Sequence, residues 1–494
     1  MDPGPVDPRV LHDLSAMDPG PIDPSVLTSQ DTHRSTDVWR GEVSRVLTCQ
    51  CQTAPLNRMG RPHPRIIPYL QQSGFYGMSC IEYIQLDWQL ITALVERWRP
   101  ETHTFHIPSG EITITLQDVA IQLGLPIDGR PVTGITNINW HIVCRKLLGI
   151  EPVDQQLKDE CLNLTWLATT FAVLPDDADE VTIQRYARAY ILQLLGGSLF
   201  VDKSQSFVHA MFLPLLEDFT VAGQYSWGSA ALAWLYRNMC HAAESHANVI
   251  AGPLILLQLW AQDRFPHIAP HRLFRHHSDV GVDAIGQPHL PSPLGIRWQD
   301  EFTVMEASTD MLQTYRCKLD RQTPDQVVWQ PYSDDVIAGL PKYCLVGQDI
   351  WRTVSPLICF HIVELHRPDR VLRQFGLQQG IPVACDTRVD LHEIYLCGGT
   401  VINWATRMRK FIVLWNRRRK HIATGRLAPS AMAYDDPYMQ WYRRITLRFV
   451  GRKGALCDMM SESMDKICRL SGQNSEAYSL ARYALQALDG VINS

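Results

Sequence analysis

Cysteine and histidine pairs that could bind a metal ion occur at three places in this sequence. They are Cys49-x-Cys51, His141-x-x-Cys144 and His276-His277. A structural zinc site needs four ligands, which in sequence usually come as two short pairs. None of the three pairs has a second pair at a workable spacing. The spacing therefore predicts no metal site.

A further histidine motif, His361-Ile-Val-Glu364-Leu-His366, superficially resembles the helical signature of zinc proteases. We expect the apolar segment Leu357–Leu365 to be a buried helix. In a helix, His361 and Glu364 share one face, whereas His366 lies about 140° from His361. The two histidines then cannot bind one ion. We expect an internal hydrogen bond or ion pair between His361 and Glu364 instead.

Nucleophile and phosphate-binding motifs are also incomplete. Ser463-x-x-Lys466 matches part of the penicillin-binding nucleophile motif, but the companion motifs are absent. Neither common glycine-rich phosphate loop occurs, and nor does a G-x-S-x-G elbow. Lys203 could form a Schiff base, but nothing else supports a pyridoxal site. We therefore predict no catalytic residue and no cofactor, and expect an interaction module. A cryptic enzyme stays an alternative, because an acidic site assembled from distant residues leaves no trace in spacing.

Two features favour contact with nucleic acid. Arg417-Arg418-Arg419-Lys420 follows the amphipathic segment Phe411–Trp415, and is a candidate nuclear import signal or phosphate-contact patch. A solvated helix end is the alternative. Thr113–Leu125 echoes the first helix of a helix-turn-helix, but Pro126 and Pro131 block a recognition helix after it. The net charge of -5 excludes a protein that coats nucleic acid through a general basic excess.

The elements that must position these residues are mostly helices. The clearest exception is a β-hairpin, in which Thr104–Ile107 and Glu111–Ile114 flank a Pro-Ser-Gly turn. Thr115 is the expected N-cap of a helix that ends at Gly124. Apolar residues at helical spacing predict further helices, which are 38–56, Cys80–Trp98, Ile183–Leu199, Ser229–Ala243, Gly252–Gln262, Tyr438–Phe449 and Ala477–Leu488. The fold class is therefore mainly α with a small β-hairpin or sheet near residues 104–115.

The domain organisation follows from proline content and from the lack of linkers. The segment MDPGPVDPRVL at Met1 recurs as MDPGPIDPSVL at Met17, and its prolines predict a disordered N-terminal tail over residues 1–37. No Pro/Ser-rich linker divides residues 38–450, so we expect one large helical domain there. Residues 451–494 are expected to form a C-terminal helical tail.

Composition limits the compartment. The 13 cysteines are odd in number and lie mostly in apolar runs, which favours reduced thiols in the cytosol or nucleus. The N-terminus has no basic start and no apolar core, so we expect no secretory signal. No apolar run reaches the roughly 18 residues that span a bilayer, and we expect no membrane contact.

Many ordered sequence blocks resemble the plant mobile domain family, and the similarity runs from about Arg61 to Val450. The blocks include Trp98–His106, Pro108–Glu111, Thr115–Val119, Leu123–Pro126, Leu199–Ser204, Tyr225–Arg237, Gly252–Gln258, Trp329–Tyr332 and Pro368–Gly376. The resemblance implies a non-catalytic regulatory protein of the nucleus. It also implies roles in meristem maintenance, transposon silencing and gene regulation, with a phosphatase-7-like protein partner. A transposable-element-derived DNA-binding or transposase-accessory protein is the alternative.

The resemblance supplies no catalytic residues, and the family's "aminotransferase-like" label finds no support in these residues. Residue chemistry alone suggests a binding surface. Arg237, Arg370 and Arg373 lie beside apolar runs and need partners. A groove lined by these arginines, with Asp202 and Lys203 nearby, would suit phosphate or an acidic peptide. The sequence does not decide the ligand or the oligomeric state.

Overall fold

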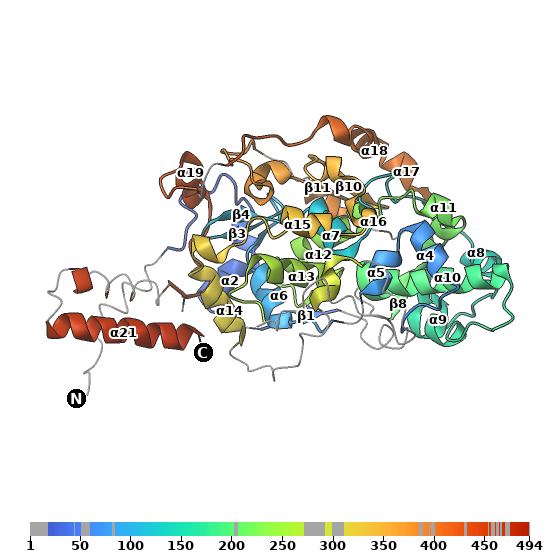
Figure 1. Cartoon of the computed structure of the whole chain (residues 1–494), viewed down its shortest axis with the longest axis horizontal. Coiled ribbons are helices and arrows are strands. Elements are labelled where there is room, and N and C mark those ends of the chain that lie inside the picture. Colours follow the sequence, from blue (N-terminus) through green and yellow to red (C-terminus); the bar gives the residue numbers. More distant parts are fainter. Residues whose placement is uncertain are drawn as a thin grey trace.

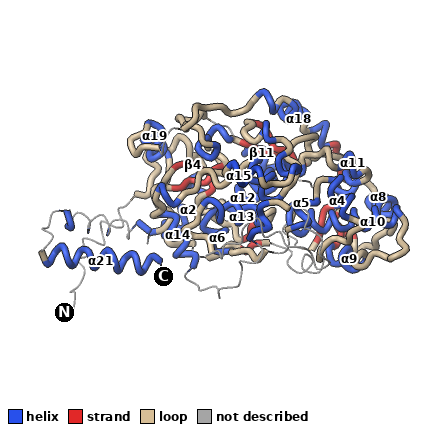
Figure 2. Tube along the Cα trace, viewed as in Figure 1, coloured by secondary structure: helices blue, strands red, loops and turns tan. Residues whose placement is uncertain are grey.

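The computed structural model describes most of the chain. The described residues are 18–43, 45–50, 60–81, 84–201, 206–270, 292–298, 311–384, 389–394, 396, 401–428, 432–452, 454–455, 460, 464, 467–469 and 475–493. The predicted fold class is confirmed, because helices dominate and the sheets are small. Figure 2 shows the strands as short segments among helices and loops. No described helix is long and apolar enough to cross a membrane.

The helices run through the whole chain. In the first half they are α2 (Arg34–Arg40), α4 (Ile67–Ser73), α5 (Tyr76–Cys80), α6 (Trp88–Val95), α7 (Leu116–Leu123), α8 (Trp140–Leu148), α9 (Leu164–Thr170), α10 (Glu180–Leu194), α11 (Phe219–Ala222) and α12 (Trp227–Ala242). In the second half they are α13 (Leu254–Arg264), α14 (Met311–Asp320), α15 (Asp334–Ala338), α16 (Lys342–Leu345), α17 (Trp404–Arg407), α18 (Arg409–Asn416), α19 (Pro437–Ile445) and α21 (Glu476–Asn493).

The strands form five small sheets in the described residues. Two are three-stranded and antiparallel: β2 (Trp98–Arg99), β3 (Thr104–Ile107) and β4 (Gly110–Ile112), then β6 (Leu157–Lys158), β7 (Cys161–Asn163) and β8 (Phe207–His209). The other three are pairs: β1 (Thr48–Cys49) with β9 (Val249–Ile250), β5 (Ile135–Thr136) with β12 (Ile402–Asn403), and β10 (Ser355–Cys359) with β11 (Ile362–His366).

Helix α12 lies at the centre of the molecule, as its lack of a polar face predicts (Figure 1). Its alanines, including Ala230 and Ala233, are completely buried. The β10–β11 hairpin packs against this helix. The hairpin β3–β4 and the helix α7 are also confirmed. Thr115 precedes α7 as predicted, and Gly124 ends it in the left-handed conformation.

The segment Leu357–Leu365 is a hairpin and not the expected helix. Ser355 pairs with His366 at one end and Cys359 with Ile362 at the other, and Phe360 turns the chain with a φ of 49°. Almost all of both strands is buried, so the alternation that marks a strand is missing from the sequence. The expected pair of His361 and Glu364 does not form. Glu364 bonds to Arg237 instead, and the His361 ring packs near Trp234.

Two further helix predictions need correction. The stretch 80–98 is not one helix, because α5 ends at Cys80 and α6 begins at Trp88. Asp87 caps α6 by accepting from the backbone N–H groups of its first turn. The stretch 38–56 is not a helix either, since α2 ends at Gly41, which has a φ of 80°. Its later part contains β1, and residues 51–59 lie outside the described residues.

Residues 18–43 pack against the domain, although the sequence predicts a disordered tail up to residue 37. Leu27 is 2% exposed and Arg34 is completely buried. The guanidinium of Arg34 lies 3.5 Å from the carboxylate of Glu96, and the Arg34 N–H donates to the carbonyl of Ala243 at 2.7 Å. The second copy of the proline motif takes part in this packing, since Leu27 is its last residue and its Asp23 N–H donates to the carbonyl of Arg444 at 2.8 Å. Residues 1–17 lie outside the described residues.

Candidate interaction groove

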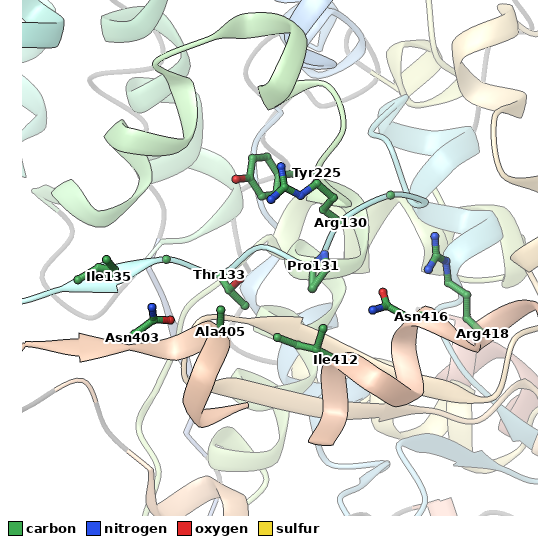
Figure 3. Close-up of a pocket in the computed structure, with 12 residues that line it drawn as sticks. Arg130, Pro131, Thr133, Ile135, Tyr225, Asn403, Ala405, Ile412, Asn416 and Arg418 are labelled. Atoms are coloured by element: carbon green, nitrogen blue, oxygen red, sulfur yellow. The ribbon is translucent and has the colours of Figure 1, made fainter. Parts of the chain in front are cut away.

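A groove with a volume of about 450 Å³ opens between one loop and helices α17 and α18. Figure 3 shows Arg130, Pro131 and Thr133 of the loop on one side, and Ala405, Ile412 and Asn416 of the helices on the other. Its remaining lining residues are Gly129, Gly134, Ile135, Tyr225, Asn403 and Arg418. Backbone, amide, guanidinium and aliphatic groups thus share one concave surface, which is the composition of a binding groove.

Two buried tryptophans fix the helical side of the groove. The indole N–H of Trp404 donates to the hydroxyl of Thr136 at 3.0 Å, and that of Trp415 donates to the carbonyl of Gly129 at 2.9 Å. The β5–β12 pair joins the same two segments through its backbone. Segments more than 260 residues apart in the chain are therefore held together at both ends of the groove.

The loop side is fixed through Tyr225. The N–H of Arg130 donates to the carbonyl of Gln224 at 2.7 Å, and the guanidinium of Arg130 lies 5.4 Å from the Tyr225 ring centre. Gly129 has a φ of 118°, and a Cβ at this position would lie 2.2 Å from the Gln224 carbonyl oxygen. Only glycine allows this close approach. The Arg130 side chain is thus presented to the groove by a rigid backbone.

The basic run 417–420 is partly structural. Arg418 is buried, donates from Nε to Asp128 at 2.7 Å and covers the Trp415 ring. Arg419 donates to Asp128 at 2.5 Å and to Asp349 at 2.6 Å. Burial raises the pKa of Asp128, but the hydrogen bonds from Arg419 and Arg418 lower this pKa by more than burial raises it. The net shift of the pKa is therefore downward. Arg418 therefore belongs to the fold rather than to a solvated helix end.

The rest of this region forms a basic ridge beside the groove. We define the basic ridge as the exposed side chains of Arg407, Arg409, Lys410, Arg417, Arg419 and Lys420. Residues 394–434 contain no Asp or Glu, so the acidic partners of Arg419, which are Asp128 and Asp349, come from other segments of the chain. Val413 and Leu414, also on α18, are 42% and 45% exposed. A surface that combines cations with exposed aliphatic groups suits an acidic segment of a partner.

The three arginines that the sequence suggests as a binding surface lie mostly inside the protein. Arg237 donates to Glu364 at 2.5 Å, and Arg370 donates to Glu111 at 2.7 Å. Arg373 donates to a backbone carbonyl and lies 3.7 Å from the centre of the Trp329 ring. The positions of these arginines in apolar runs correctly indicate that they need partners. The partners are groups inside the protein and not a bound phosphate or acidic peptide. Asp202 and Lys203 lie outside the described residues.

The sequence gives no signal for the loop side of the groove. Arg130 and Tyr225 are far apart in the chain, and neither lies in a motif with chemical meaning. Only the run Arg417–Lys420 points to this region. The structure adds that the run lies on the rim of a groove, since Arg418 lines it.

Comparison with known proteins identifies the family. The plant mobile domain family model matches residues 74–443, which is most of the chain. The chain belongs to the plant mobile domain family. The resemblance inferred from the sequence blocks is thereby confirmed. The groove lies within the matched region, as do α17 and α18. No solved structure matches the chain.

Three relatives from Arabidopsis thaliana show different amounts of overlap. The chain is 48% identical over 454 residues to "Serine/threonine-protein phosphatase 7 long form homolog", and this covers 91% of the chain but 32% of the relative. It is 34% identical over 473 residues to "Protein MAIN-LIKE 2", covering 94% of the chain and 65% of the relative. It is 33% identical over 443 residues to "Protein MAINTENANCE OF MERISTEMS", covering 88% and 86%. The chain thus spans about a third of the phosphatase relative and about two thirds of MAIN-LIKE 2.

Proposed function

We propose that this plant mobile domain protein is a non-catalytic interaction module of the nucleus, which acts with a phosphatase-7-like serine/threonine phosphatase. The observation that supports it most is the overlap with the phosphatase relative, where the shared region is only 32% of the longer protein. That protein keeps most of its length outside the shared region. We infer that its phosphatase part lies there, and that the region shared with the present chain acts together with a phosphatase.

A phosphatase that binds the chain as a separate molecule would need a larger contact surface than a fused one. Fusion holds two domains at a high effective concentration, so even a weak contact persists. A partner in trans must be held by contacts alone, and the groove with its basic ridge provides them. The exposed cations of Arg417 and Lys420 can meet carboxylates or phosphates, while Ile412 and Tyr225 offer apolar contact.

The biological setting is part of the same proposal. The match to "Protein MAINTENANCE OF MERISTEMS" covers 86% of that protein's own length. This supports a role in meristem maintenance, and we propose gene regulation, including transposon silencing, within the nucleus as part of that role. The basic run contributes to binding rather than to nuclear import in this proposal. Arg418 is buried against Asp128, and an import signal needs its cations to be accessible.

The proposal is tested by purifying the full chain with a recombinant phosphatase-7-like catalytic domain. The test variant is Arg417→Glu/Lys420→Glu, and the matched control is Arg145→Glu/Lys146→Glu on the exposed face of α8. We expect wild type and control to bind the phosphatase with similar affinity. We expect the test variant to bind at least about tenfold more weakly, because close interfacial charge pairs contribute about 1.5 kcal/mol or more. Absence of binding, or equal binding by all three proteins, contradicts the proposal.

A second candidate is a DNA-binding or transposase-accessory protein, and the basic ridge favours it. Phosphate contacts make affinity fall linearly with the logarithm of the salt concentration. If the ridge contacts DNA, purified protein binds duplex DNA with that salt dependence, and the Arg417→Glu/Lys420→Glu variant has a smaller slope. Nuclease treatment of a nuclear affinity purification separates the candidates, since it releases partners held through DNA and leaves a directly bound phosphatase.

A further inference from the structure

Four buried side chains with metal-binding atoms meet at one point in the interior. They are His103 after β2, Cys240 on α12, Glu364 on β11, and His392 on the short 3-10 helix Val389–Glu393. One donor atom from each lies within 4.8 Å of the others. Motif spacing does not reveal this set, because its members are up to 289 residues apart.

The ring of His103 is held in position for binding a metal ion. Its Nδ1 lies 2.9 Å from the carbonyl oxygen of Leu365, which can only accept, so Nδ1 carries a proton. The backbone of His103 is left-handed, with a φ of 52°, which is costly for a residue with a side chain. Nε2 is buried and has no hydrogen bond of good geometry among the described residues, yet it lies 3.1 Å from Oε2 of Glu364. In the tautomer with the proton on Nδ1, the lone pair of His103 Nε2 therefore points at the carboxylate of Glu364.

The carboxylate of Glu364 faces one arginine and both histidines of the set. Arg237 donates from Nε to Oε1 at 2.5 Å. Oε2 lies 3.1 Å from Nε2 of His103. Nε2 of His392 faces both oxygens, at 3.2 Å from Oε1 and 3.3 Å from Oε2. A carboxylate that an outer partner holds and that also faces two imidazoles is typical of a metal ligand with its supporting shell.

Cys240 distinguishes a metal site from an ordinary buried ion-pair network, because such a network does not need a thiol. Its Sγ accepts a hydrogen bond from the indole N–H of Trp98 at 3.3 Å. A network of Arg237, Glu364 and two histidines balances charge without a thiol. A metal ion uses the sulfur as a ligand, and the indole N–H then stabilises the thiolate.

We propose that His103, Cys240, Glu364 and His392 form a structural zinc site. Nitrogen, sulfur and carboxylate oxygen are the ligands of Zn²⁺, and four protein ligands make the closed tetrahedral site typical of structural zinc. Bond lengths of about 2.0–2.3 Å place tetrahedral donors about 3.3–3.6 Å apart, so binding contracts the widest pair by about 1 Å. His392 is the most exposed of the four, at 9%, and marks the entry side.

Such a site joins four parts of the fold around α12. It connects the turn after β2, the hairpin β10–β11 and the 3-10 helix Val389–Glu393 to the central helix. Arg237 competes with the ion for the charge of Glu364, so Cys240 and the two imidazoles must supply most of the affinity. The proposal does not depend on any partner, and it stands or falls separately from the proposed function.

The test uses the purified full chain with zinc as the probe. Zinc content is measured after dialysis, and affinity by competition with a chelator. Cys240→Ser and His392→Gln are the test variants. Cys144→Ser, a buried cysteine on α8, and His241→Gln, a neighbour of His392, are the matched controls. We expect one zinc per wild-type and control chain. We expect at least about tenfold weaker binding in the test variants, since even outer-shell changes cost 10–100-fold.

Cobalt(II) substitution adds a spectroscopic readout. A tetrahedral site with a thiolate gives intense visible bands and a sulfur-to-cobalt charge-transfer band, and the latter disappears in Cys240→Ser. Circular dichroism establishes whether each variant is folded. If Cys240→Ser does not fold, the zinc affinity of His392→Gln, at the entry side, tests the proposal instead. No stoichiometric zinc in wild type, equal affinity in wild type and the folded test variants, or a cobalt spectrum without the charge-transfer band overturns the proposal.

Discussion

Glu111 shows how one buried carboxylate joins distant residues. It is 1% exposed, and its Oε1 accepts from Nε of Arg370 at 2.7 Å and from the hydroxyl of Thr104 at 3.2 Å. Burial raises the pKa of Glu111, but Arg370 and His106 lower it more, to about 2. The sequence indicates that Arg370 needs a partner. It cannot name Glu111, which is 259 residues away on another element.

Replacing Glu111 with glutamine should destabilise the protein by about 3 kcal/mol at pH 7, because it leaves the guanidinium of Arg370 buried without its counter-charge. The folded-state pKa is depressed from 4.5 to about 2. The carboxylate therefore contributes stability that is complete above the unfolded pKa and is lost as the pH falls through this range. Urea unfolding at several pH values should show the difference between wild type and Glu111→Gln shrinking by about 1 kcal/mol between pH 7 and pH 4.

Glu217→Gln is the control for this experiment. Glu217 pairs with Lys146, but its side chain is 53% exposed. An exposed pair contributes about 0–1 kcal/mol, so this variant should be nearly as stable as wild type. A Glu111→Gln protein as stable as the control at pH 7, or a difference that does not change with pH, contradicts the role assigned to Glu111.

Among the helices and strands, the sequence correctly predicts those whose hydrogen bonds join residues close together in the chain. Thr115 donates both its N–H and its hydroxyl to Asp118 at 2.7 Å, and this short-range pattern correctly predicts the start of α7. The hairpin β10–β11 is different, because its strands are buried against α12 and so carry no alternation. Tertiary burial removes the signal that would distinguish it from a helix.

Helices α5 and α7 meet backbone to backbone, and Gly77 makes this possible. A Cβ at Gly77 would lie 2.8 Å from the Cα of Gly124 and 2.8 Å from the carbonyl oxygen of Leu123. These are backbone atoms and cannot rotate away. Gly77→Ala should therefore lower the unfolding free energy by about 1–3 kcal/mol, even though alanine favours a helix by about 1 kcal/mol. Chemical denaturation of the purified variant measures this change.

Gly380→Ala serves as the comparison, because no heavy atom lies within 4 Å of the added Cβ there. We expect its stability to stay within about 0.5 kcal/mol of wild type. If Gly77→Ala matches Gly380→Ala, the contact between α5 and the end of α7 is looser than the structure shows.

For the whole molecule, the fold class and the family follow from the sequence, but the sites do not. Periodicity identifies α12 as central because a helix without a polar face must be enclosed. The groove needs Arg130, Tyr225 and Asn416, and the proposed zinc site needs four residues from four elements. Residues that come together only through tertiary packing have no fixed spacing in the sequence, so no sequence motif predicts these sites. The domain limits at 38 and 450 stay predictions.

The contacts at both ends of the chain argue that the folding unit is larger than residues 74–443. On the N-terminal side, Arg34 lies beside the carboxylate of Glu96, and Leu47 is completely buried. On the C-terminal side, the N–H groups of Val450 and Gly451 donate to buried Asp320 at 2.8 Å and 3.1 Å. Removing both flanks leaves two buried carboxylates with fewer donors and exposes apolar core.

We therefore expect a fragment of residues 74–443 to unfold at a clearly lower urea concentration than a fragment of residues 18–452. The expected difference in unfolding free energy is about 3 kcal/mol or more, since weakening the partners of a buried charge alone costs this much. Hydrogen exchange should locate the loss in α6 and α14, which carry Glu96 and Asp320 at their ends. Equal midpoints for the two fragments would show instead that the flanks only cover a domain that is stable without them.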